Sequence, residues 1–182
     1  MRVQFYKPNA KVTGSACSFW LTEDGSIMSS LIKQDSWDNA KKRGSFSKNK
    51  DNPDKKVIIK LGNSEAGAII DSLENNRKWS SYHQSKNQIT KINFGPYERN
   101  GEQIGFSYSI NKEDKEDSTN KVGFVIGFTF GEGVLLREAL KGAIQKSVSA
   151  SEAPKYNSSP RPSPEGNLSP QHEDALDNED MW

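Results

Sequence analysis

Eight segments of the chain carry the pattern of β-strands, and two carry the pattern of helices. Side chains of a strand alternate between two faces, so a half-buried strand shows apolar residues at every second position. The segments that we predict as strands are residues 2–6, 16–22, 26–34, 56–61, 78–83, 88–94, 103–112 and 122–126. A helical pattern follows the fourth and the eighth of them. The predicted order is therefore four strands, a helix, four strands and a second helix.

Both predicted helices begin at recognisable N-terminal signals. Asn63 or Ser64 is expected to cap the first helix, and its apolar face contains Ala66, Ile69, Ile70 and Leu73. Thr129 and Glu132 match a capping box at the start of the second helix, which we expect to end near Ser147. The apolar face predicted for the second helix contains Val134, Leu135, Leu140, Ala143, Ile144 and Val148.

The alternation also predicts which way individual side chains point. Ile104, Phe106, Tyr108 and Ile110 are expected to share one face, and Trp20 is expected to point away from Phe19 and Leu21. Residues 122–126 are apolar on both sets of positions, which favours a strand buried on both faces. Gly95 and Pro96 are expected to end the strand at 88–94, because proline cannot donate to a strand ladder.

These patterns predict an α+β fold, in which a four-stranded antiparallel sheet followed by a helix occurs twice, and a C-terminal tail outside the core. We assign residues 1–148 to a folded domain, 149–170 to a Ser/Pro-rich flexible linker and 171–182 to an acidic tail that ends in Met-Trp. A flexible chain of about 30 residues has a root-mean-square reach of roughly 30 Å. The tail is therefore expected to reach either the domain or a partner.

Positive and negative charges are also distributed unevenly along the chain. The 182 residues have a formal net charge of +1, but residues 151–182 contain seven acids and two bases, whereas residues 1–150 contain 17 acids and 23 bases. A basic domain with an acidic tail suits a polyanionic ligand for which the tail competes.

The sequence offers little for catalysis, metal binding or membrane insertion. There is one cysteine, Cys17, and the two histidines, His83 and His172, lie far apart in the chain. No phosphate-binding glycine motif occurs. We therefore expect no enzyme, no metal and no cofactor. No apolar stretch approaches the roughly 18 residues of a membrane span, and we expect the protein in the cytoplasm or nucleoid, or in the host cytoplasm if it is viral.

A basic segment at residues 40–50 is the strongest binding signal. It contains five cations, no acid and Phe46, and Trp37 lies just before it. Cations contact phosphates, and aromatic rings stack on unpaired bases. The alternative is a flexible basic loop with Phe46 packed against the domain. The full set of predicted nucleic-acid contacts is Lys7, Lys11, Trp37, Lys41, Lys42, Arg43, Phe46, Lys48, Lys50, Lys60, Arg77, Trp79, Tyr82, Lys91 and Tyr97. Half or more of the aromatic residues are expected in the core.

The tail places large apolar side chains after a run of acids. It contains Glu173, Asp174, Asp177, Glu179, Asp180, Met181 and Trp182. A partner that buries Trp182 explains this pattern, whereas the alternative is a solvated chain end. The tail resembles those of single-stranded DNA-binding proteins, which implies docking of replication or repair proteins.

Three segments of the domain resemble the Whirly family of single-stranded DNA-binding proteins. Residues 61–67 resemble the first strand-to-helix junction of that family, Tyr82-His83 its aromatic-histidine strand end, and residues 105–110 its seventh strand. The resemblance spans roughly residues 3–146. The family's first-strand signature differs here, because Pro8 stands where the signature has glycine. The resemblance implies binding to single-stranded nucleic acid on sheet surfaces and a homo-oligomer, for which we expect a tetramer.

We therefore expect a single-stranded DNA-binding protein of low sequence specificity that acts in replication, recombination or repair. One alternative is a single-stranded RNA-binding protein or RNA chaperone of the same fold, because RNA offers the same phosphates and stackable bases. A second alternative is a protein-interaction adaptor or a structural oligomer.

Overall fold

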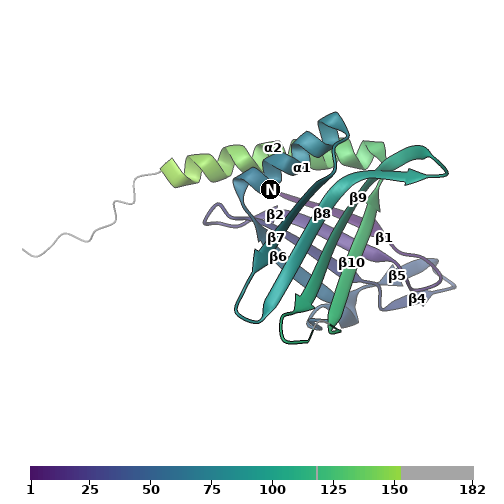
Figure 1. The fold of residues 1–182 in the computed structure, drawn as a ribbon. Helices are drawn as coiled ribbons and strands as arrows, with labels where there is room; N and C mark the ends of the chain where they lie inside the picture. The colour runs from purple at the N-terminus through teal and green to yellow at the C-terminus, as the bar shows by residue number, and fades with distance from the viewer. Residues whose placement is uncertain (118, 153–182) are drawn as a thin grey trace, which may run out of the picture.

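The computed structural model describes residues 1–117 and 119–152. Figure 1 shows two antiparallel sheets that cross each other and two helices that lie side by side along one end of the second sheet. The α+β class with antiparallel sheets is confirmed. The predicted tail and most of the predicted linker, residues 153–182, lie outside the described residues.

The first sheet has the strand order β1-β2-β3-β6. Its strands are β1 (Arg2–Lys7), β2 (Ser15–Leu21), β3 (Ile27–Lys33) and β6 (Lys56–Leu61), all within two residues of the predicted bounds. A tight turn joins β2 to β3, where Gly25 adopts a φ of 79° that a side chain would disfavour. The strong alternation in these segments therefore allowed the bounds of the strands to be predicted closely from the sequence.

A two-stranded ribbon, absent from the sequence prediction, lies between β3 and β6. It consists of β4 (Ser36–Asp38) and β5 (Arg43–Ser45), and a short 3-10 helix at Ser47–Asn49 follows it. The side chain of Gln34, which is buried, fastens its base by donating to the carbonyl oxygens of Asn9 and Ser36 at 3.0 and 2.8 Å. Strands of three residues are too short to show a periodic pattern, so the sequence predicted a loop here. Because the ribbon is inserted in the first half, the two halves of the described chain differ in their order of elements.

The second sheet has the order β10-β9-β8-β7. Its strands are β7 (Trp79–Gln84), β8 (Gln88–Arg99), β9 (Glu102–Asp114) and β10 (Lys121–Phe128). The prediction that Gly95 and Pro96 end β8 was wrong, because the strand continues past them to a bulge at Tyr97 and Glu98. The turn to β9 uses Asn100 and Gly101, whose φ values are 53° and 81°.

The prediction that residues 122–126 are buried on both faces was also wrong. Strand β10 lies at the sheet edge and is buried on one face only: Phe124, Ile126 and Phe128 are buried, but Val125 is 59% exposed. Ile104, which was predicted to share a face with Phe106, Tyr108 and Ile110, is exposed near the outer end of the β8–β9 hairpin, whereas the other three are buried.

The helices are α1 (Asn63–Asn75) and α2 (Phe130–Glu152). Gly62, rather than Asn63 or Ser64, is the N-cap of α1, and its N–H donates to Glu65 at 2.9 Å. Helix α2 continues past the predicted end near Ser147. Its fully buried residues are Leu136, Leu140 and Ala143, whereas Val134 and Leu135, predicted on the inner face, are half exposed.

The core lies between the two sheets and beneath the helices. Phe5 packs edge-on against Phe128 with ring centroids 4.9 Å apart, and Phe19 contacts Tyr108 at 5.5 Å. The Tyr108 hydroxyl donates to Ser29 Oγ at 3.1 Å, a buried bond between the sheets. Because the inner faces and the helices form the core, the outer face of each sheet is left for binding.

Candidate nucleic-acid interface

The outer side of the first sheet carries cations and aromatic rings without any acid, and we call it the sheet-1 face. The strand register places on it Arg2, Gln4 and Tyr6 of β1, Ala16, Ser18 and Trp20 of β2, Met28, Ser30 and Ile32 of β3, and Lys56, Ile58 and Lys60 of β6. No carboxylate at these positions neutralises the cations. Asp24, in the turn between β2 and β3, interacts electrostatically with Lys60 at one edge of the face. A polyanion would therefore meet a face whose own side chains carry net positive charge.

Trp20 lines a shallow hollow on the sheet-1 face. The hollow has a volume of about 300 Å³, and Arg2, Ser30, Lys56 and Ile58 line it as well. Trp20 points away from the buried Phe19, as the alternation predicted. An indole flanked by cations and an aliphatic side chain offers a stacking surface for a base and charge for the adjoining phosphates.

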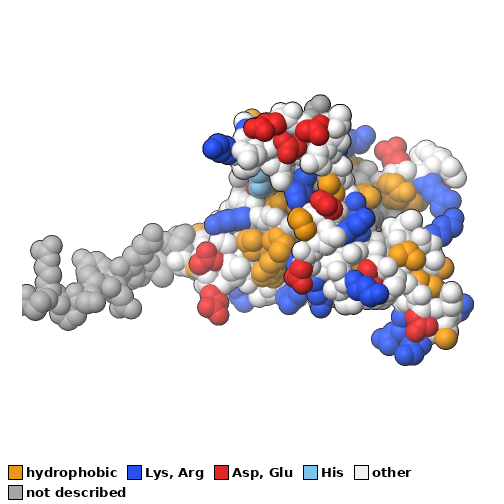
Figure 2. Space-filling view, turned by 90° about the horizontal axis from the view of Figure 1, so that it is seen from below, with side chains coloured by type: hydrophobic (Ala, Val, Ile, Leu, Met, Phe, Trp, Pro, Cys, Tyr) orange, Lys and Arg blue, Asp and Glu red, His pale blue; other side chains and the backbone are white. Residues whose placement is uncertain are grey.

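The basic ribbon projects beside this face. Asp38 Oδ1 accepts the N–H groups of Ala40 and Lys41 at 2.9 and 3.0 Å, which closes the tight turn at the tip. The exposed side chains of Lys41, Lys42 and Arg43 lie at this tip. Figure 2 shows Lys and Arg side chains gathered at the end of the molecule where β4 and β5 lie. The ribbon therefore presents its cations away from the core.

Phe46 joins the ribbon to the sheet-1 face. Its ring packs edge-on against Tyr6, with centroids 6.0 Å apart, and it is half-buried. The packing of Phe46 against the domain thus matches the alternative that the sequence left open, although the ring keeps an exposed part. Trp37 is half-buried too, and its Nε1 is buried with no hydrogen-bond partner among the described residues.

The outer side of the second sheet, the sheet-2 face, is more nearly neutral. Tyr82, which is 66% exposed, and Lys91 are register partners on this face. The Lys91 and Lys121 ammonium groups lie 3.1 and 3.3 Å from Glu113, and they hold the pKa of that carboxyl below its usual value. The predicted Tyr82 and Lys91 therefore lie together, but with much of the positive charge compensated.

Other predicted contacts interact with the protein itself. Lys7 Nζ lies 2.6 Å from both carboxylate oxygens of Glu132, at the start of α2. Trp79 is partly buried and packs against the core. Arg77 lies 3.6 Å from Asp71 of α1 in an exposed ion pair. Lys7 therefore forms an ion pair with the start of α2, Trp79 packs against the core, and Arg77 pairs with α1.

The remaining predicted residues are dispersed. Lys11 is exposed in the loop after β1, and Lys48 and Lys50 are exposed around the short 3-10 helix. Lys60 lies on the sheet-1 face, in one row with Arg2 and Trp20. Tyr97 is 45% exposed at the bulge of β8. The structure therefore gathers the ribbon residues and Lys60 near one surface, and places Tyr82, Lys91 and Tyr97 on the second sheet.

His83 takes part in a structural bond network. Glu65 Oε1 accepts from Ser81 Oγ at 2.7 Å and lies 2.9 Å from His83 Nε2. Burial raises the pKa of Glu65, but the bonds from Ser81, Gly62 and His83 outweigh it and lower the pKa below its usual value. Ser81 donates to the carboxylate and not to the imidazole, so this is not the relay of a hydrolase.

Two further observations concern residues 1–117 and 119–152 only. No group of three or more His, Cys, Asp or Glu side chains in this part of the chain is arranged to hold a metal ion. Neither helix described here has the length and apolar character needed to cross a membrane.

Similarity to known proteins lies at the level of structure. No protein-family model matches the sequence, and the comparison with curated proteins finds no match. The plant transcriptional regulator PBF-2 superimposes with a TM-score of 0.59 at 15% identity, over 84% of this chain and 85% of that chain. WHY3 and WHY1 from Arabidopsis thaliana both superimpose with a TM-score of 0.58, at 14% and 13% identity, over 84% of this chain and 90% and 87% of theirs.

The chain has a Whirly-like fold. The resemblance read from residues 61–67, 82–83 and 105–110 is thereby confirmed at the level of the fold. At such low identity the Whirly-like fold does not transfer individual binding residues, so the interface has to be argued from the side chains of this chain.

Sequence reasoning missed several side chains of the sheet-1 face. Arg2, Lys56 and Ile58 were not among the predicted contacts, and Trp20 was placed on the correct side of its strand without being selected. The available signal was the absence of acids at the outward positions of all four strands, which becomes visible only once the strand register is known.

Proposed function

We propose that this protein binds single-stranded DNA with little sequence specificity. The observation that carries the proposal is the hollow on the sheet-1 face, which Trp20 lines together with Arg2 and Lys56 and which no acid lines. The Whirly-like fold supports it, since the resemblance to that family implies binding to single strands.

The expected mode of binding follows from the chemistry of this face. Cations contact phosphates whatever the base sequence, and each stacked base contributes about 1–3 kcal/mol. Trp20 and Tyr6 supply rings, and Arg2, Lys56 and Lys60 supply charge. Stacking accepts every base, so sequence preference is expected to be weak.

The biological setting is part of the proposal. We place the protein in DNA replication, recombination or repair, in the cytoplasm or nucleoid or in the cytoplasm of a host cell, without catalytic activity. PBF-2 is a plant transcriptional regulator, so transcription is the alternative process for this fold. Recruitment of partner proteins is assigned to Glu173, Asp174, Asp177, Glu179, Asp180, Met181 and Trp182 of the acidic tail, which lie outside the described residues.

We further propose a homo-oligomer, with a tetramer as the expected state. Phe130, Val134 and Leu135 are each about half exposed along α2. Phe130 and Val134 also line a small hollow, to which Leu73, Phe106, Asn76 and Arg137 contribute. Large apolar side chains grouped on one helix gain free energy when a second copy covers them.

A competition titration tests the function. Fluorescently labelled oligo-dT is titrated with the full chain, and unlabelled oligo-dT, oligo-U and duplex DNA of the same length compete. The proposal predicts that oligo-dT competes best and that affinity falls as salt rises. Preference for oligo-U would favour the RNA-binding alternative. Equal competition by duplex would contradict single-strand binding, and absence of any binding would favour the adaptor or structural oligomer.

A further inference from the structure

A cleft lies at the free edge of the second sheet, next to the end of the sheet-1 face at which Lys56 lies. It lies between β10, the loop at residues 12–15 and the segment that runs from the end of β3 to Lys55. Its volume is about 590 Å³, within the range of roughly 300–1,000 Å³ typical of small-molecule sites. The space is therefore large enough for one nucleotide unit.

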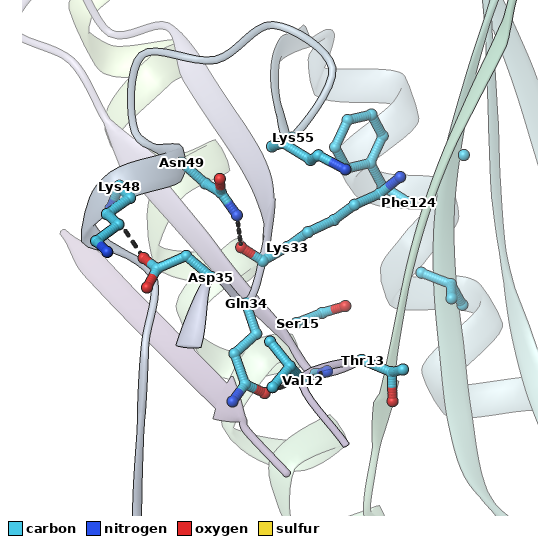
Figure 3. A pocket seen from close by; sticks show the side chains of 13 residues that line it. Val12, Thr13, Ser15, Lys33, Gln34, Asp35, Lys48, Asn49, Lys55 and Phe124 are labelled. Carbon is cyan, nitrogen blue, oxygen red and sulfur yellow. Dashed lines mark hydrogen bonds between the residues drawn. The ribbon is translucent and has the colours of Figure 1, made fainter. Parts of the chain in front are cut away.

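Lys33 and Lys55 extend into this cleft from different segments. Figure 3 shows both side chains directed toward Phe124 of β10. The Lys33 ammonium lies over the Phe124 ring, 4.9 Å from its centroid. Since a cation over an aromatic face is attracted to the ring, this contact holds the charge inside the cleft rather than in solvent.

Neither ammonium group forms a salt bridge within residues 1–117 and 119–152, although the Asp54 charge acts on Lys33. No salt bridge there involves Lys33 or Lys55, whereas Lys7, Lys91, Lys121 and Lys141 each have one. Asp35 also lines the cleft, but its carboxylate accepts from Ser36 Oγ, Ser45 Oγ and the Lys48 N–H. Asp35 therefore serves the base of the ribbon.

The pKa of Lys33 reflects the same surroundings. Burial lowers the pKa of Lys33 below its usual value, and the neighbouring Lys55 charge lowers it further, while Asp54 acts in the opposite direction. Like charges brought together by a fold gain most from an anion placed between them. Backbone groups on the free edge of β10 add hydrogen-bonding capacity at the same place, because β10 pairs with β9 only.

The cleft adjoins the sheet-1 face at the start of β6. Lys55, which points into the cleft, precedes Lys56, which points onto the sheet-1 face. The Lys33 N–H donates to the Lys55 carbonyl oxygen at 2.8 Å, so the end of β3 and the start of β6 are tied together here. A single-stranded nucleic acid that lies on the sheet-1 face and extends beyond Lys56 would therefore reach this cleft.

We propose that the cleft binds a backbone phosphate of the single strand through the Lys33 and Lys55 ammonium groups. This inference rests on the proposed function and adds a second contact, at the edge of β10. Lysine acts on phosphate as a point charge, so two ammonium groups suit a phosphodiester of any sequence.

Lysine acetylation of the full chain, read by peptide mass spectrometry, tests the proposal. The protein is treated with an acetylating ester alone, with oligo-dT of about 30 nucleotides, and with inorganic phosphate at the same total phosphate concentration. The expected result is that oligo-dT slows acetylation of Lys33 and Lys55 several-fold and inorganic phosphate does not. Lys86 and Lys146, exposed on a turn and on α2, serve as controls whose acetylation stays unchanged.

Each other outcome overturns the proposal. If oligo-dT binds in a parallel titration but leaves Lys33 and Lys55 fully reactive, the cleft is not a contact, although the proposed function stands. If inorganic phosphate protects both lysines as well as oligo-dT does, the cleft takes a small phosphate and not the strand. If oligo-dT does not bind at all, both the cleft contact and the proposed function fail.

A paired variant gives a second readout. Lys33→Gln with Lys55→Gln is expected to weaken oligo-dT binding and to lower the slope of log affinity against log salt by about 0.7 for one lost phosphate contact. Lys86→Gln with Lys146→Gln removes the same charge elsewhere and is the matched control. An equal loss in both pairs would show a general charge effect and overturn the proposal. If the double variant does not fold because the half-buried Lys33 is needed for folding, Lys55→Gln alone is measured in its place, with the same expected direction of change.

Discussion

At the scale of single residues, one carboxylate holds the start of α1 against β7. Glu65 accepts from the Gly62 N–H at 2.9 Å and from Ser81 Oγ at 2.7 Å, and it lies 2.9 Å from His83 Nε2. Only 17% of its side chain is exposed. Loss of a charged acceptor from such a site leaves two or three donors without a strong partner.

We expect Glu65→Gln to destabilise the fold by about 1–3 kcal/mol at neutral pH. The folded-state pKa of Glu65 is lowered, so its stabilising contribution is present above the unfolded pKa and is lost as pH falls through the folded pKa. The difference between wild type and variant should therefore be largest near neutral pH and shrink below about pH 4. Thermal unfolding across pH measures it, and a difference that does not change with pH would contradict this account.

Residue patterns predicted the direction of some side chains but not their partners. Alternation placed Trp20 opposite the buried Phe19, which the structure confirms. It did not show that Lys7 binds Glu132, because those residues are 125 positions apart and meet only when α2 packs beside β1. Nor did it show that Trp79, with cations beside it in sequence, packs against the core.

At the scale of elements, the ribbon is the feature most specific to this chain. Its tip carries Lys41, Lys42 and Arg43, and the turn is closed by bonds to Asp38. Strong strands such as β6 were located from the sequence to the residue. The ribbon was not located, since strands of three residues are too short to show alternation and depend on Gln34 and other tertiary contacts for their existence.

Neutralising the ribbon tip should weaken single-strand binding without unfolding the domain. In Lys41→Gln/Lys42→Gln/Arg43→Gln, the slope of log affinity against log salt is expected to fall by about 0.7 for each lost phosphate contact. Salt-dependent oligo-dT titration measures the change, and circular dichroism checks the fold. If the variant keeps the wild-type slope, the ribbon tip does not contact the nucleic acid.

Helix α2 carries the second prediction at this scale. Leu135→Lys places a charge among half-exposed apolar side chains and is expected to convert the oligomer to smaller species, because burying an unpaired charge at an interface is costly. Sedimentation velocity of wild type and variant decides it. Lys146→Glu, a charge change at an exposed position of the same helix, is the control, and an unchanged mass for Leu135→Lys would contradict the assignment.

At the scale of the whole molecule, the charge asymmetry between domain and tail links the two proposed roles. Residues 1–150 carry 23 bases against 17 acids, and residues 151–182 carry seven acids against two bases. Composition alone predicted this division. Which surface of the domain carries the uncompensated charge depended on the strand register, which brings Arg2, Lys56 and Lys60 onto one face.

Neutralising Glu173, Asp174, Asp177, Glu179 and Asp180 to their amides should raise oligo-dT affinity at low salt. The gain should shrink at high salt, where the screening length falls to a few ångström. Met181→Ala with Trp182→Ala keeps the charge and is expected to leave affinity unchanged. If the amide variant binds no better at low salt, the tail does not compete for the DNA surface.

The most direct test of the central claim is oligo-dT affinity of Trp20→Ala measured beside Tyr82→Ala, with thermal unfolding as the check on folding. Binding of single-stranded DNA on the sheet-1 face predicts that Trp20→Ala loses about 1–3 kcal/mol of binding free energy, which is the contribution of one stacked base. Its salt dependence should stay unchanged, and Tyr82→Ala on the sheet-2 face should lose less. Wild-type affinity for a folded Trp20→Ala variant would contradict the account.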